Sequence, residues 1–286
     1  MKTNIPERIA ALREAMRQQK VDAYIIPSSD PHLSEYPADR WKSREWISGF
    51  TGSAGTIVVT ADKAGLWTDS RYFLQAASQL EGSGIELYKL ALPETPSITE
   101  FLLHELHAGQ AVGLDGQTYS AAEASALANK LNRKEIKLDT SADLIEGIWK
   151  DRPAVPGNPI FEMPEALSGA SVHEKLDLIN NQLRSEGADC LILAALDEIA
   201  WTFNIRGTDV TYNPVVVSYA FVSEDESVLF IKPEKLTAEI TEHLKKEGVT
   251  LAEYSMIQRY LSRLPENSRV FAVSYTHLTL PTICSV

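Results

Sequence analysis

Asp69 and Arg71 are the charged side chains whose setting most favours a role in binding. They follow the short apolar run at 66–68, so they stand at the end of an expected strand. A guanidinium can grip a carboxylate or a carbonyl group in a fixed geometry. It can equally pair with the neighbouring carboxylate and hold the strand end together. The residue types therefore allow two interpretations, a substrate-binding Arg71 or a structural Asp69–Arg71 ion pair.

A glycine-rich loop precedes this strand. Glycine stands at positions 49, 52 and 55, and a β-branched run at 57–60 follows. Such glycines suit a backbone with positive φ or a close approach to another surface. A phosphate loop would lead into a helix, and a nucleophile elbow needs Gly-x-Ser-x-Gly, whereas Ser53 lies in Thr-Gly-Ser-Ala-Gly. We therefore expect a tight structural turn between core strands.

The histidines give weaker signals. His32 and Glu35 lie in one polar loop, where two ligands alone are poor grounds for a metal site, so a solvated or interdomain loop is favoured. His104 and His107 are three residues apart, whereas the zinc helix His-Glu-x-x-His places its histidines four apart. The sequence therefore assigns no catalytic residue and no metal ligand to this chain.

A second group of polar side chains lies around an Asn-Pro turn in the later half of the chain. A buried network that joins a strand end to this turn explains the group as well as a cleft-facing site does, and both interpretations stay open. Trp201 beside it is expected to be a core or interface anchor, like Trp46 and Trp67. The polar group comprises Asp197, Glu198, Arg206, Asp209 and Asn213.

Composition and charge limit the partners. The chain has 286 residues, 44% of them apolar, which is enough for two domains of ordinary size. Asp and Glu number 39 against 27 Lys and Arg, so no basic excess favours nucleic acid or an anionic membrane. No apolar run approaches the ~18 residues of a membrane span, and we see no signal peptide. Cys190 and Cys284 make no disulfide framework, so we expect a cytoplasmic protein.

Helices alternate with short strands along the chain, which predicts an α/β fold. Asn4 is a candidate N-cap, and Ile9, Leu12 and Met16 follow at helical spacing, so the first element is an amphipathic helix. The next element is a buried strand at 21–26. The expected elements after it are a loop at 28–44, strands at 57–60, 66–68, 85–90, 112–115 and 136–138, and helices at 72–80, 98–107 and 121–131.

The pattern then restarts after a proline-rich segment at 151–164. Leu176 stands 167 positions after Ile9, and residues 188–193 repeat the pattern of 21–26 at the same offset. We infer an internal duplication that produces two domains of one fold. The expected organisation is a first domain at 1–152, a linker at 153–168 and a second domain at 169–272.

The last 14 residues break this pattern. In the first copy a helix, a strand and a closing helix follow the strand at 112–115, whereas only 14 residues follow the matching strand at 270–272. Residues 273–286 continue neither a helical nor a strand pattern, and they resemble an in-frame translation of a transposon-type sequencing adapter. We therefore expect the second domain to be incomplete and residues 273–286 to be a non-native tail.

Several blocks of the chain combine into one specific pattern. The longest are Ile-Ser-Gly-Phe-Thr-Gly-Ser-Ala-Gly-Thr at 47–56 and Leu-Trp-Thr-Asp-Ser-Arg-Tyr-Phe at 66–73, with shorter blocks at 23–28 and 196–201. Together they resemble the N-terminal part of cytosolic-type Xaa-Pro aminopeptidases (aminopeptidase P), which belong to the creatinase/prolidase "pita-bread" metallopeptidase superfamily. The resemblance covers nearly the whole chain, to about residue 272.

The resemblance implies a fold and a reaction. The fold is α/β, with two tandem creatinase N-terminal-like (ribonuclease H-like) domains that have mixed sheets flanked by helices, the second truncated. The family's chemistry lies in a C-terminal domain, where two Asp, one His and two Glu hold two divalent metal ions, Mn or Zn. That domain is not part of this sequence, so we expect no cofactor in this chain. The whole hydrolase would release the N-terminal residue from short peptides with proline in second position.

The resemblance also implies roles for particular residues. In the family the arginine at the position of Arg71 contacts peptide substrate, although Ser70 here replaces a common glycine. Asp69, Arg206 and Asn213 would face the cleft or the domain interfaces. The region would orient substrate, restrict access and support a homodimer, and this chain alone would be inactive. The alternative is a non-catalytic module that binds peptides or histones; the acidic charge fits it, but no long acidic tail is present.

Overall fold

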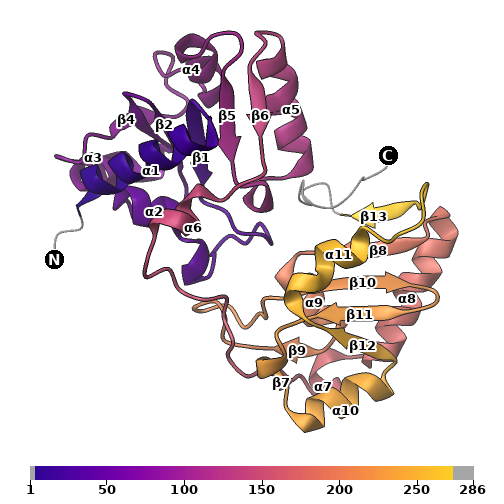
Figure 1. Cartoon of the computed structure of the whole chain (residues 1–286). Helices are drawn as coiled ribbons and strands as arrows, with labels where there is room; N and C mark the ends of the chain where they lie inside the picture. Colours follow the sequence, from indigo (N-terminus) through magenta and orange to yellow (C-terminus); the bar gives the residue numbers. More distant parts are fainter. Residues whose placement is uncertain (1–3, 273–286) are drawn as a thin grey trace. The chain divides into compact units, whose positions relative to one another are not determined.

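The computed structural model describes residues 4–272, which form two compact units (Figure 1). Unit 1 comprises Met1–Asp30 and Asp39–Pro153, and unit 2 comprises Pro31–Ala38 and Ala154–Val286. The short segment Pro31–Ala38 therefore belongs to unit 2, although it precedes most of unit 1 in sequence. The prediction of a non-native tail at 273–286 lies outside the described residues.

Unit 1 is built on a six-stranded mixed sheet with the order β4-β3-β2-β1-β5-β6. β1 pairs with β2 and β2 with β3 in antiparallel fashion, while the β1–β5, β5–β6 and β3–β4 pairs are parallel. The strands are β1 Ala23–Pro27, β2 Thr56–Thr60, β3 Ala64–Thr68, β4 Glu86–Lys89, β5 Ala111–Leu114 and β6 Lys137–Asp139.

Helices cover both faces of this sheet (Figure 1). α1 begins after Asn4, whose side chain accepts a hydrogen bond from the Glu7 N–H, and it buries one apolar face together with α6 and α2. α4 and α5 bury the opposite face. The helices are α1 Ile5–Gln19, α2 Ser43–Ser48, α3 Phe73–Gln79, α4 Ile98–Glu105, α5 Ala121–Asn132 and α6 Leu144–Ile148.

Unit 2 repeats this plan. Its main sheet has the order β12-β11-β10-β8-β13, and a two-stranded ribbon of β7 and β9 lies beside it. α8 begins and ends 167 positions after α1, which confirms the predicted duplication. The strands are β7 Phe161–Glu162, β8 Cys190–Leu193, β9 Ile205–Arg206, β10 Tyr219–Ser223, β11 Ser227–Phe230, β12 Val249–Ala252 and β13 Val270–Ala272. The helices are α7 Glu165–Ser168, α8 Val172–Glu186, α9 Leu196–Thr202, α10 Ala238–Lys246 and α11 Ile257–Leu261.

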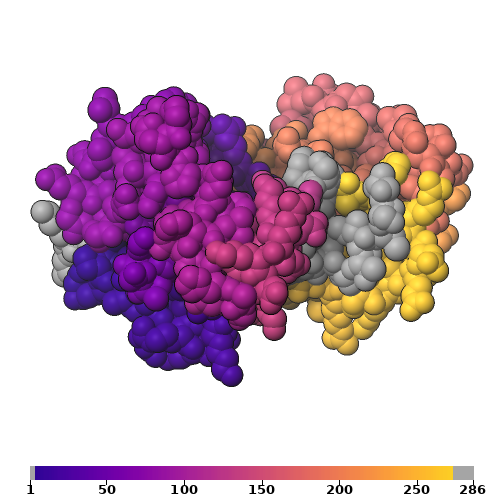
Figure 2. All heavy atoms as spheres, turned by 90° about the horizontal axis from the view of Figure 1, so that it is seen from above, coloured from indigo at the N-terminus to yellow at the C-terminus, as the bar shows by residue number. Residues whose placement is uncertain are grey.

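The α/β fold with mixed sheets and flanking helices is therefore confirmed, and side chains close around the sheet of each unit (Figure 2). Within residues 4–272, unit 2 has no strand beside β13 that corresponds to β6. The loop expected at 28–44 is shorter than predicted, because η1 Asp39–Trp41 and the start of α2 occupy its end. No helix in the described range is both long and apolar enough to cross a membrane.

Candidate functional site

The turn after β3 holds the best-supported sequence candidate. Asp69 is the N-cap of η2 Ser70–Tyr72, and its Oδ1 accepts a hydrogen bond of 3.0 Å from the Arg71 N–H. The Arg71 guanidinium donates from Nε to Oδ1 at 2.9 Å and from Nη2 to Oδ2 at 2.8 Å, a bidentate pair. The structural interpretation of this pair is therefore realised. The guanidinium is still 66% exposed, and the Arg71 pair holds the pKa of Asp69 below its usual range.

The glycine loop packs against the same turn. The Tyr72 hydroxyl and the Ser53 hydroxyl lie 2.7 Å apart, and this hydrogen bond lowers the pKa of Tyr72. A side chain at Gly52 would place a Cβ 2.7 Å from the Tyr72 ring, so only glycine allows the approach. Gly49 ends α2 with φ of 73°. The loop therefore joins α2 to β2 instead of joining two strands, which corrects the sequence-based expectation.

Arg44 is the residue that sequence reasoning missed. It is 6% exposed, and its guanidinium donates to the carbonyls of Phe50 and Gly52 and, at 2.8 Å, to the Ser28 hydroxyl. Ser28 in turn donates to the Gly55 carbonyl at 2.7 Å. Burial lowers the pKa of Arg44 to about 10, so the side chain stays cationic near neutral pH. Arg44 thus fixes the shape of the glycine loop that meets Tyr72.

The candidates of unit 2 lie in different settings. Arg206 in β9 donates to the carbonyls of Ala200 and, at 2.9 Å, Ile205, so its guanidinium ties α9 to β9. Asn213 is exposed in a turn closed by a bridge between Val210 and Asn213. Within unit 2 these contacts fit the expectation of a polar network that joins a strand end to a turn.

The other polar residues of that region divide into a buried pair and a surface pair. Asp209 and Lys235 form an ion pair with both side chains 1% exposed or less, and the Asp209 carboxylate also accepts from the Val217 N–H at 2.7 Å. Asp197 is exposed, whereas burial raises the pKa of Glu198, with Asp197 adding to the effect. The pair of Asp209 and Lys235 holds the 209–217 segment in place.

The histidines form no metal site among the described residues. His32 is 3% exposed in unit 2, where one ring nitrogen lies 2.8 Å from the Ala194 carbonyl oxygen and the other 2.9 Å from the Tyr254 hydroxyl. Burial lowers the pKa of His32 to about 3, so the ring is neutral. Glu35 is exposed. His104 is exposed and lies 2.9 Å from Glu105.

The donor set does not fit a metal centre. Within residues 4–272, no three His, Cys, Asp or Glu side chains come close enough together to hold a metal ion. The two-metal centre that the sequence resemblance implies for the whole enzyme thus finds no ligand set in the part of the chain that the structure describes. We therefore derive no catalytic step through a metal here.

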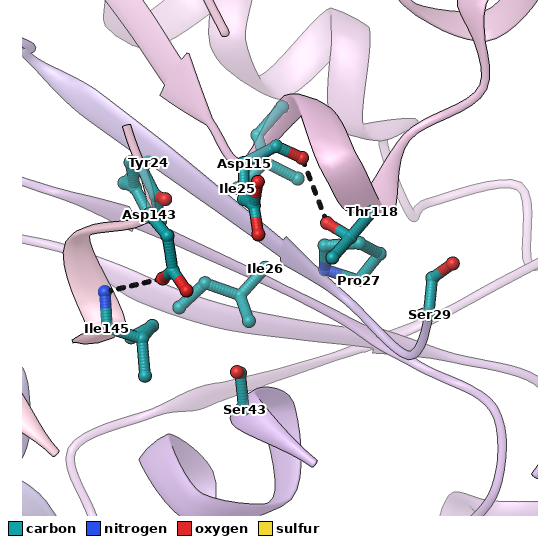
Figure 3. A pocket seen from close by; sticks show the side chains of 10 residues that line it. All are labelled: Tyr24, Ile25, Ile26, Pro27, Ser29, Ser43, Asp115, Thr118, Asp143 and Ile145. Carbon is teal, nitrogen blue, oxygen red and sulfur yellow. Dashed lines mark hydrogen bonds between the residues drawn. The ribbon is translucent and has the colours of Figure 1, made fainter. Parts of the chain in front are cut away.

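Unit 1 also contains a small cavity at the ends of β1 and β5 (Figure 3). It encloses about 270 Å3 of free space, its open mouth included. Asp115, Asp143 and Ser43 point into it from three different elements (Figure 3). Burial raises the pKa of Asp115 to about 6, and the neighbouring Asp143 adds to this shift. No sequence motif marks the cavity, because its polar residues lie far apart in the chain.

Comparisons with known proteins match both units. The creatinase/prolidase N-terminal domain family matches residues 8–148, and a second model with the same description matches residues 151–284. A probable Xaa-Pro aminopeptidase P from Coprinopsis cinerea is 40% identical over 263 residues, which cover 91% of this chain and 42% of that relative. Aminopeptidase P2 from Arabidopsis thaliana is 40% identical over 268 residues, which cover 92% of this chain and 38% of that relative.

A solved structure shares the arrangement of the fold. X-prolyl aminopeptidase from Caenorhabditis elegans, described as a cytosolic enzyme with a di-nuclear active site, is 31% identical with a TM-score of 0.86. The match covers 90% of this chain and 44% of that protein. The chain therefore spans about two fifths of the length of the relatives it matches and corresponds to their N-terminal part.

Proposed function

The chain belongs to the creatinase/prolidase N-terminal domain family and carries two of its domains, and we propose that it is the non-catalytic N-terminal region of a metal-dependent Xaa-Pro aminopeptidase. The observation that carries this proposal is the 40% identity to aminopeptidases P along almost the whole chain. The whole enzyme would release the N-terminal residue from short peptides with proline in second position. Its two divalent metal ions, Mn or Zn, would be held by the part that follows.

Within this region, Arg71 is the proposed peptide contact. Its guanidinium is fixed by the bidentate bond to Asp69, so little side-chain entropy remains to be lost when it binds a carbonyl or a carboxylate. Two thirds of the side chain is exposed, which supports access by a peptide. The aromatic ring of Tyr72 lies beside the guanidinium, 5.3 Å from its carbon to the ring centroid, and offers an apolar surface for a proline ring.

The further roles are proposals of the same kind. The two domains would orient substrate, limit access to short peptides and support a homodimer of the full-length enzyme. We place the enzyme in the cytoplasm, as the C. elegans relative is described as cytosolic. Arg206 and Asn213 would lie at the cleft or at an interface of the full-length enzyme, where the exposed Asn213 turn is the more accessible of the two.

The experiment is an activity assay of the purified 286-residue chain. It is incubated with a peptide of the form Xaa-Pro-Xaa, with and without added manganese or zinc, and release of the N-terminal residue is followed by mass spectrometry. We expect no turnover above buffer under any condition, because the described residues offer no metal ligand set. Metal-dependent release by the pure chain would refute the non-catalytic assignment.

A peptide-binding measurement tests Arg71 in the same chain. We expect Arg71→Ala to weaken binding of a Xaa-Pro peptide about tenfold, the effect of one charge-assisted pair at an exposed site. Lys63→Ala is the matched control, since Lys63 is an exposed cation of the same unit that pairs with Glu105. Equal weakening by both variants would mean that Arg71 contributes only general positive charge.

A further inference from the structure

The cavity of unit 1 lies where the topology of the sheet creates a crevice. β1 and β5 are neighbouring parallel strands, yet the chain leaves β1 for β2 on one side and reaches β5 on the other. Connections that diverge in this way open a gap outside the carboxyl ends of the two strands, and ligands of α/β proteins bind in such gaps. The cavity borders Pro27 at the end of β1 and Asp115 just after β5.

The lining combines a carboxylate pair with an apolar wall. The side chains of Asp115, Asp143 and Ser43 converge on the free space, while Ile26 and Ile145 form its aliphatic side (Figure 3). The acidic groups come from two separate loops, and Ser43 comes from the start of α2. The cavity therefore presents oxygen acceptors at one place and hydrocarbon at another, as an amphiphilic ligand requires.

The two carboxylates differ in how their charge is balanced. Asp143 accepts the N–H groups of Ile145 and Glu146 and forms an ion pair with Arg152, which is itself buried. Asp115 accepts only one backbone N–H, that of Gln117 at 2.9 Å, and none of the ion pairs within residues 4–272 includes it. The cavity thus contains one largely buried carboxylate without a cationic partner of its own.

We propose that this cavity binds the ammonium group of a primary amine, with Asp115 as its counter-charge and the aliphatic stem of the amine against Ile26 and Ile145. An ammonium group offers three donors, and the Asp115 carboxylate and the Ser43 hydroxyl supply acceptors. A divalent metal fits less well, because no three metal-ligating side chains meet in the described residues. The proposal stands apart from the aminopeptidase assignment and does not depend on it.

Several charged groups act on Asp115 and set the pH at which the cavity would bind. Asp143 disfavours its ionisation, Arg152 and Arg40 favour it, and the largely buried Tyr24 hydroxyl lies close enough for its own pKa to be raised by Asp115. Because only the ionised carboxylate attracts a cation, amine affinity should rise between pH 5 and about pH 7. The amine itself stays protonated throughout this range.

The test is a titration of the 15N-labelled chain with n-propylammonium chloride at pH 7.5, followed by the backbone amide signals of Gln117, Thr118 and Ile145. We expect saturable shifts of these signals and at least a tenfold weaker affinity for Asp115→Asn. The matched control is Asp139→Asn, because Asp139 also ends a strand and accepts the N–H two residues on, at 2.9 Å, yet does not line the cavity. It should bind like the parent chain.

Three further arms make the result decisive. Ser43→Leu fills the cavity and keeps both carboxylates, so it should also abolish the shifts. Tetramethylammonium, which has no N–H group, should not bind, and glycinamide should bind as well as propylammonium if the natural ligand is a peptide N-terminus rather than a free alkylamine. Shifts of equal size with potassium chloride, or unchanged affinity in Asp115→Asn, would overturn the proposal.

Discussion

The turn that follows β3 in unit 1 and the turn that follows β11 in unit 2 occupy the same place in the repeat. In unit 1, η2 presents Arg71 at the surface, two thirds exposed and paired with Asp69. In unit 2, η4 Pro233–Lys235 directs Lys235 inward, where it is fully buried and paired with Asp209. Each turn therefore places a basic residue beside an acid, but one pair faces solvent and the other lies in the core.

This difference separates two uses of one supersecondary unit. An exposed cation fixed by a neighbouring acid can meet a ligand at little cost. A buried cation cannot, but it can tie distant segments together, and Asp209 links the Lys235 turn to the 209–217 segment through the Val217 N–H. Duplication thus left unit 1 with an accessible charged turn and gave unit 2 an internal link of the same composition.

A second contrast concerns the cation that covers a tryptophan. Arg8 of α1 lies over Trp46 at 4.3 Å from the ring centroid, and Lys175, 167 positions later, lies over Trp201 at 4.5 Å. Trp46 also stacks on Trp149 with ring centroids 5.1 Å apart, whereas Trp201 is 49% exposed. The same cation–aromatic pair is therefore closed off in unit 1 and open in unit 2.

The largest expected effect breaks the buried pair. Lys235→Met should lower the free energy of unfolding by about 3–5 kcal/mol, because it leaves the Asp209 carboxylate buried without a cation. Arg71→Met, the same change at the surface turn, should cost no more than about 1 kcal/mol. Urea unfolding followed by circular dichroism measures both. Equal losses would show that the two turns do not differ as described.

The tryptophan contrast predicts the next largest effect. Trp46→Ala should cost about 2–3 kcal/mol, since it removes both the stacking on Trp149 and the burial of α2. Trp201→Ala should cost about 1 kcal/mol or less, because half of that side chain is exposed. Urea unfolding of the two variants checks this order. A greater loss for Trp201→Ala would contradict the contrast.

Asp115 gives a pH-dependent effect of similar or smaller size. Since its pKa is raised to about 6 in the folded chain, the folded state holds this proton more tightly than the unfolded state. Its contribution to the free energy of unfolding therefore falls as pH rises from about 4 to about 6 and stays low above that. Asp115→Asn should stabilise the chain by about 2 kcal/mol at pH 7.5 and hardly at all at pH 4.

Thermal melts at both pH values measure this difference. Asp69→Asn is the comparison, because Asp69 caps η2 as Asp115 caps η3 Gly116–Thr118, but its pKa is lowered by Arg71. That variant should be less stable than the parent chain at pH 7.5, the opposite sign. A stabilised Asp69→Asn, or an Asp115→Asn that loses stability at pH 7.5, would contradict the assignment of the two acids.

The smallest effect sharpens the role of the surface turn. Arg71→Lys keeps the charge but loses the planar fork that bonds both oxygens of Asp69. The free energy of unfolding should change by no more than about 0.5 kcal/mol. Peptide affinity should fall about as far as in Arg71→Ala if geometry matters, and hardly at all if charge alone matters.

Much of the fold could be predicted because local patterns and the repeat agree. The helix that begins after Asn4 and its counterpart 167 residues later follow from caps and apolar spacing. α2 was missed because it has only six residues and the side chain of Lys42 makes no capping bond. Its formation depends on the buried contacts of Ile47 in the core, which the sequence alone does not display.

The site could be predicted only in part. The block that contains Asp69 and Arg71 is contiguous, so its residues were found, but the sequence could not decide between a bond within the turn and a contact with substrate. Arg44 was missed because its partners are backbone carbonyls, which carry no sequence signal. The cavity was missed because Asp115 and Asp143 come together only through the pairing of β1 with β5 and the position of α6.

The most direct test of the contrast between the two turns is a peptide titration followed by NMR. A Xaa-Pro peptide is added to the 15N-labelled chain, and the Arg71 side-chain Nε–H signal and the Tyr72 amide are compared with the amides around Lys235. We predict saturable shifts at Arg71 and Tyr72, no shifts around Lys235, and loss of the shifts in Arg71→Ala. Shifts confined to unit 2, or unchanged by Arg71→Ala, would contradict the account.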